Sequence, residues 1–119
     1  MVYLLVEIKT ALERLGFPVF YGVAEDVANN LPWTYIVFFR ERISQNQNKT
    51  GFTDYYTVAI VHEDWIPDEA ISDTIAALEA LPGIRLASQD IDVNYTRKPG
   101  TNHVVEIATL SFSHSRKRV

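Results

Sequence analysis

WTYIVFFRER at residues 33–42, SQNQNKTG at residues 44–51 and FTDYYTVAIVHE at residues 52–63 are the stretches that decide the fold. The first and third are rich in aromatic and β-branched residues, which are typical of strands. The centre of the first is apolar on both faces, so we expect it inside a sheet that is covered on both sides. The middle stretch is polar and rich in turn formers, and it predicts an exposed loop. Together they predict a long β-hairpin with arms of ~35 Å, whose tip projects beyond the core.

Two amphipathic helices are predicted, one on each side of this hairpin in the chain. The first covers about residues 3–15, where apolar residues recur at the i, i+3, i+4 and i+7 spacing of one helical face. These residues are Leu4, Leu5, Ile8, Ala11, Leu12 and Leu15. Gly16 and Pro18 indicate its end. The second begins at Pro67, whose ring suits a first helical turn, and ends at the Pro82-Gly83 pair.

Shorter strands complete the predicted order. Residues 17–21 form a brief apolar run, residues 84–95 hold one or two strands, and residues 103–114 form the last strand. In residues 91–95, apolar and acidic or amide side chains alternate, which predicts a half-exposed strand with an acidic outer face. The whole pattern predicts the α+β class. We expect a mostly antiparallel sheet with a long hairpin and two helices packed against it, in a single domain spanning residues 1–119.

The composition fits one soluble domain. The chain has 119 residues, of which 47% are hydrophobic and 22% charged, so disorder is excluded. It has no cysteine, which excludes disulfides, thiolate zinc sites, iron–sulfur clusters and cysteine nucleophiles. The apolar N-terminus has no basic start and is interrupted by Glu7 and Lys9. It therefore predicts the start of a helix rather than a signal peptide, and the expected compartment is the cytoplasm in which the protein is made.

Charge is distributed unevenly along the chain. Residues 1–95 hold six Lys and Arg against fourteen Asp and Glu, while residues 96–119 hold five against one. An acidic body with a basic end does not suit a general nucleic-acid binder, which carries a basic face. It suits head-to-tail contact between copies, in which a basic end meets an acidic body. The alternative is a tail that serves solubility only.

The sequence predicts no catalytic, cofactor-binding or metal-binding residue. His62, His103 and His114 are not spaced as metal ligands. His62 and Glu63 are the best candidates for acid–base work, but neighbouring strand residues point to opposite faces. The glycine motifs of serine hydrolases, dinucleotide sites and phosphate loops are absent. We therefore expect a protein that is not an enzyme.

The polar and basic segments are the candidate interface instead. They are Gln45, Asn46, Gln47, Asn48 and Lys49 in the hairpin loop, Arg97 and Lys98 in a second loop, and Arg116, Lys117 and Arg118 in the tail. These segments suit contact with other protein copies.

Several stretches in the right order resemble a known family. They are LPWTYIV at residues 31–37, DYYTV at residues 54–58, YTRKPGT at residues 95–101 and EIATLSF at residues 106–112, ahead of RKRV at residues 116–119. With the small α+β size and the early amphipathic helix, they resemble the tail-terminator, or tail-completion, proteins of long-tailed bacteriophages with non-contractile tails. The resemblance covers most of the chain.

The resemblance implies a structural role in the virion. Tail terminators form a ring, expected to hold six copies, on the head-proximal end of the tail tube, where it ends tube polymerisation and offers a surface for head joining. The implied partners are further copies of the chain, the major tail tube protein and a head–tail connector or head-completion protein. Phage DNA would pass through the lumen without specific binding, and an acidic lining would help it pass.

Three alternatives remain open at this point. One is a phage head-completion or connector subunit, which shares the size and general character of terminators. Another is a small dimeric module that binds a ligand or peptide along its sheet. The last is a small hydrolase using His62 or His103.

Overall fold

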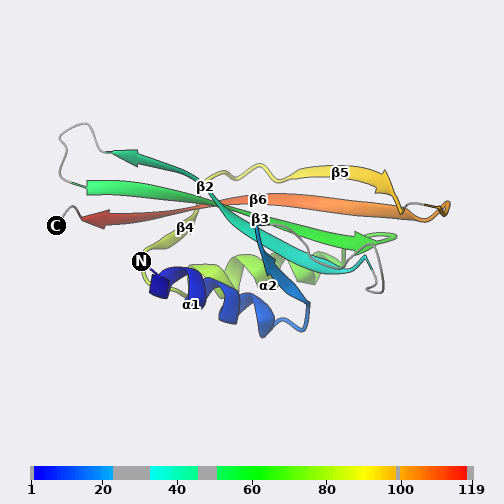
Figure 1. Ribbon diagram of the computed structural model, residues 1–119, viewed down its shortest axis with the longest axis horizontal. Coiled ribbons are helices and arrows are strands. Elements are labelled where there is room, and N and C mark those ends of the chain that lie inside the picture. Colours follow the sequence, from blue (N-terminus) through cyan, green and yellow to red (C-terminus); the bar gives the residue numbers. More distant parts are fainter. Residues whose placement is uncertain (1, 23–32, 46–50, 99, 118–119) are drawn as a thin grey trace.

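The computed structural model describes residues 2–22, 33–45, 51–98 and 100–117. In chain order the elements are α1 (Val2–Glu13), β1 (Val19–Tyr21), β2 (Tyr35–Gln45), β3 (Gly51–Glu63), α2 (Asp68–Glu79), β4 (Ile84–Leu86), β5 (Asp92–Arg97) and β6 (Val104–Lys117). The strands form one mixed sheet in the order β1-β2-β3-β6-β4, and β5 pairs with β6 along the same edge as β4. Both helices lie against one face of it (Figure 1). The predicted α+β class with its long β2–β3 hairpin is confirmed.

The main core lies between the helices and the sheet. Ile8 and Leu12 of α1 and Leu78 of α2 are fully buried against sheet residues of the same face. The sheet contributes Ile36, Phe38, Tyr56, Val58, Ile60, Ala108, Leu110 and Phe112. Burying each large side chain of this kind contributes about 1.5–3 kcal/mol, so this face carries most of the stability.

The opposite face of the sheet has a smaller apolar cluster. Tyr35, Val61 and Val105 are buried there, and Trp33 packs against them. The centre of β2 is thus apolar on both sides, as its sequence predicted, but the helices cover only one of them. Within the described residues, neither helix has the length and apolar character that crossing a bilayer requires.

The helix ends differ slightly from the prediction. α1 ends at Glu13, and the chain turns through Gly16 at a φ of 92°, a conformation that glycine adopts without strain. Pro67 occupies the N-cap of α2, one position before the first helical residue. Asp68 and Glu69 then lie in the first turn, where the helix dipole favours acids.

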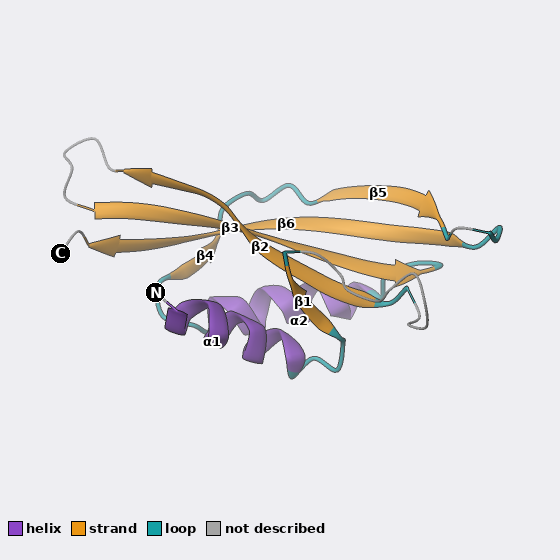
Figure 2. Ribbon diagram, viewed as in Figure 1, coloured by secondary structure: helices purple, strands orange, loops and turns teal. Residues whose placement is uncertain are grey.

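Three strands continue well past the helices and form an arm (Figure 2). The arm consists of residues 43–45 of β2, 51–54 of β3 and 114–117 of β6. Ser44, Gln45 and Gly51 were expected in a loop, and Arg116 and Lys117 in a tail, but all five lie in strands. Their backbones are paired across the ladder, which overrides the weak strand propensity of polar residues. The molecule consequently reaches 52 Å along its longest axis.

One strand is much more exposed than its pattern predicted. β5 was expected to bury one face, yet all six of its residues are exposed. The register pairs Val93 with Ala108 and Tyr95 with Glu106, so these apolar side chains share the helix side of the sheet. Alternation correctly predicted the strand but overestimated its burial, because both faces of β5 are exposed.

Candidate interface surfaces

The arm brings together two of the three predicted interface segments. In the register, Gln45 is opposite Phe52, and Phe52 is opposite Arg116, while Lys117 is opposite Gly51. The end of the hairpin and the basic C-terminal segment thus form one tip, although they are far apart in sequence. Asn46, Gln47, Asn48, Lys49 and Arg118 lie outside the described residues.

A β-bulge marks the base of the arm. Arg40 pairs with Tyr56 and Arg42 with Tyr55, so Glu41 is the extra residue. The Glu41 carboxylate accepts a hydrogen bond from the Thr57 hydroxyl at 2.9 Å and contacts the Arg42 guanidinium at 2.8 Å. That guanidinium lies 4.0 Å from the centre of the Tyr55 ring, in a cation–π contact. These contacts fix the direction in which the arm leaves the body.

The third predicted segment, Arg97 and Lys98, lies at the opposite end of β6. We call this region the turn end; it consists of the β5–β6 turn, the β3–α2 connection at residues 64–67 and the neighbouring Trp33 and Glu63. There the Glu63 carboxylate accepts a hydrogen bond from the Trp33 backbone N–H at 3.1 Å and lies 3.6 Å from the Lys98 ammonium. Lys98 also donates its backbone N–H to the His103 carbonyl at 3.0 Å. Lys98 is therefore held within its own chain, whereas Arg97 is exposed on β5.

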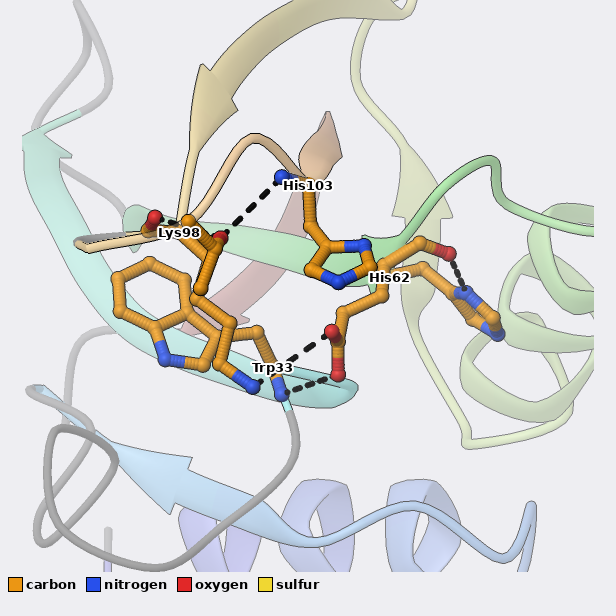
Figure 3. A network of polar contacts seen from close by, with 6 residues as sticks. Trp33, His62, Lys98 and His103 are labelled. Atoms are coloured by element: carbon orange, nitrogen blue, oxygen red, sulfur yellow. Dashed lines mark hydrogen bonds and ion pairs between the residues drawn. The ribbon is translucent and has the colours of Figure 1, made fainter.

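The histidines at this end do not form a catalytic arrangement with Glu63. The His62 ring donates from Nδ1 to the Glu63 backbone carbonyl at 2.8 Å and packs edge-on against Phe17. Figure 3 shows it directed away from Trp33 and Lys98. His103 is exposed in the β5–β6 turn. In the described part of the chain, no group of three or more histidine and carboxylate side chains is placed to hold a metal ion.

Glu106 organises a second part of the turn end. Its Oε1 accepts the Ile66 backbone N–H at 2.8 Å. A hydrogen bond and the negative charge of Glu106 also raise the pKa of the Tyr95 phenol above its usual value of 10.0. One carboxylate therefore links the β3–α2 connection to β5.

Sequence reasoning missed the exposed aromatic residue in that connection. Trp65 is 71% exposed, and it follows Asp64, which has a φ of 69°. The signal was present in EDWIPDE at residues 63–69, where a tryptophan between acidic residues comes just before the proline that opens a helix. Strand propensity alone gave no reason to separate this tryptophan from the core aromatics.

Comparison with known proteins gives little further information. No family model matches the chain, and no curated protein matches its sequence. One solved structure, which bears only a serial code as its name, aligns over 95% of this chain and 91% of its own with 13% identity and a TM-score of 0.45. A likeness at that level carries no argument about function.

Proposed function

We propose that this chain is a structural subunit of a phage tail, which forms a ring on the head-proximal end of the tail tube. In this role it ends tube polymerisation and offers a surface for head joining, without chemistry of its own. The observation that carries the proposal is the arm, since its three strands extend past the helices and end in the polar hairpin and basic segments. Such an extension suits contact with a neighbouring subunit or with the tube.

The physical requirement for such a protein is simple. A tube built from one heterologous contact keeps growing until its end is blocked. A ring that matches the tube on one side and a different partner on the other blocks growth by shape alone. Exposed strand edges can add backbone pairing across subunits. β5, exposed along its whole length, and the arm strands supply two such elements.

The first test is the order of genes around this one. A tail-tube gene that follows closely, with head-joining genes before it, is the expected result. Metabolic or regulatory neighbours would count against the proposal, and a small binding module would become the better explanation.

The second test measures tube length directly. The tube protein encoded nearby is polymerised with and without this chain, and lengths are measured by electron microscopy. We expect the chain to cap the tubes. Removal of residues 116–118 should weaken capping most at low salt, because at high salt screening already weakens the contacts that these exposed charges make in the wild-type chain. Arg97→Glu is a comparison charge change near the other end of β6, of two charge units against three, and it avoids the Lys98–Glu63 pair. Tubes that grow equally long with and without the chain would overturn the proposal.

A further inference from the structure

Two exposed apolar surfaces lie at opposite edges of the sheet. The first, the Trp65 surface, consists of Trp65, Val93, Tyr95 and Val104. The second, the Tyr21 groove, is lined by Leu5, Val6, Lys9, Tyr21 and Phe38. The Trp65 surface lies at the edge formed by β5, with contributions from β6 and the β3–α2 connection. The Tyr21 groove lies at the opposite edge, where β1 and α1 meet.

The Trp65 turn is fixed on both sides. The Asp64 backbone N–H donates to the Val104 carbonyl at 2.8 Å, and the Ile66 N–H donates to Glu106 at 2.8 Å. Asp64 takes a left-handed conformation, which is uncommon for a residue other than glycine. Two hydrogen bonds and an unusual backbone conformation thus present a large aromatic side chain to solvent. Tryptophan is one of the residue types that contribute most to the binding energy at protein interfaces.

Tyr95 extends this surface along β5. Tyr95 is the register partner of Glu106, the residue whose carboxylate accepts the Ile66 N–H, so Tyr95 lies close to the Trp65 turn. Its side chain is 64% exposed. Val93 and Val104 lie on the same face of the sheet as Tyr95, because Val93 is two residues before Tyr95 and Val104 is paired with Arg97, two residues after it. Both are also exposed.

The Tyr21 groove is a shallow apolar hollow of the size of a side chain. It has a volume of about 220 Å³, and the edge of the Tyr21 ring packs on Phe38 with ring centres 5.1 Å apart. Drug-sized ligand sites measure about 300–1,000 Å³, so this groove suits a protein side chain better than a cofactor. Val6 is 56% exposed and Tyr21 50% exposed at its rim.

We propose that the Trp65 surface of one copy packs into the Tyr21 groove of a second copy. The two surfaces lie at opposite edges of the sheet, which is the arrangement that joins copies head to tail and lets a ring close. Charge agrees with this pairing. Lys9 is the charged residue of the groove and lies 3.9 Å from Glu13 on its own exposed helix face. Trp65 is flanked by Asp64 and by the acidic first turn of α2 at Asp68 and Glu69. This inference rests on the proposed function for its biological role, since it names the contact between ring subunits.

The area that a few side chains can bury is small for one contact between two copies. Tyr and Trp side chains bury about 150–250 Å² each, whereas a stable interface buries about 1,200–2,000 Å² in total. One such contact alone is therefore weak, while a closed ring gives every copy two of them.

The test uses the absence of natural cysteines. Two copies are joined by a flexible linker of about 60 residues with a span of ~45 Å, which raises the effective concentration to about the millimolar range. One copy carries Val6→Cys and the other Val93→Cys, and a short bis-maleimide is added. We expect a crosslink between the copies. Asn94→Cys in place of Val93→Cys is the matched control, because Asn94 is next in the strand and faces the other side of the sheet.

Further variants separate the contact from chance proximity. Trp65→Ala is expected to lower the crosslinking rate at least fivefold, while Ile43→Ala, which removes an exposed apolar side chain from the arm, leaves it unchanged. Equal crosslinking by the Val93 and Asn94 positions, no crosslink at all, or efficient crosslinking of Val6→Cys with itself would each overturn the proposal. Crosslinking as expected together with uncapped tubes would sustain this contact and reject the tail function.

Discussion

The arm and the turn end are the two ends of the same strand, β6, but they are held in different ways. The arm is held mainly by backbone pairing between β2, β3 and β6, with one bulge at its base. At the turn end, the carboxylates of Glu63 and Glu106 accept hydrogen bonds from backbone N–H groups that are distant in sequence. Side-chain changes should therefore disturb the turn end more than the arm, and the following predictions test this difference.

Glu106→Ala is expected to have the largest effect. The change removes the acceptor of the Ile66 N–H and the partner of Tyr95. Leaving a partly buried donor without a partner costs about 1–3 kcal/mol of unfolding free energy. Urea unfolding followed by tryptophan fluorescence measures it. Glu106→Gln keeps an acceptor and should lose less than half as much, and equal losses in both variants would contradict the role given to this hydrogen bond.

Glu63→Ala should rank second at about 1 kcal/mol, because it removes the acceptor of the Trp33 N–H. Glu63→Gln keeps that acceptor and loses only the ion pair with Lys98, which is partly exposed. Such pairs contribute about 0.2–1 kcal/mol, so the glutamine variant should become less distinct from wild type as salt rises. The same urea assay at low and high salt gives both values.

Arg42→Ala probes the arm and should cost only ~0.5–1 kcal/mol, through its cation–π contact with Tyr55. Its informative readout is hydrogen exchange of residues 43–45 and 51–54, which should speed up while exchange in the centre of β3 stays unchanged. Arg40→Ala is a neighbouring control on the same strand. If Arg42→Ala lost more unfolding free energy than Glu106→Ala, the expectation that side-chain changes disturb the turn end more than the arm would be wrong.

Tyr95 supplies the smallest effect, which depends on pH. Its pKa is raised in the folded state by Glu106, so the bonded phenol stabilises the fold fully below pH 10.0, and this contribution is lost as pH rises through the higher folded value. Ultraviolet titration of wild type against Tyr95→Phe isolates this group. In Glu106→Gln, the Tyr95 pKa should move back toward 10.0.

The sequence predicted the body of this fold better than its ends. Apolar periodicity located both helices and the hairpin, because burial of Ile8, Leu12 and the centre of β2 dictates those elements locally. It could not predict that Gln45 and Lys117 continue strands, since their pairing depends on partners distant in sequence. The candidate interface was predicted from charge, which indicated Arg97 and Lys98 alike. Only the structure separates Lys98, paired with Glu63, from exposed Arg97.

The exposed aromatic surface was beyond sequence reasoning for a related reason. Trp65 and Tyr95 are residue types that more often lie in a core. Their exposure depends on where the Asp64 turn and β5 lie in the fold, which periodicity does not specify.

The continuous pairing of β3 with β6 also has a mechanical consequence. Thirteen residue pairs, from Gly51–Lys117 to Glu63–Val105, join the two strands without a register shift. A pull along the strands from opposite ends would load this ladder in shear, so many hydrogen bonds would have to break together rather than one after another. Resistance to such a pull depends on the unfolding rate rather than on equilibrium stability. The paired strands β3 and β6 can therefore transmit a pulling force between the tip of the arm and the turn end.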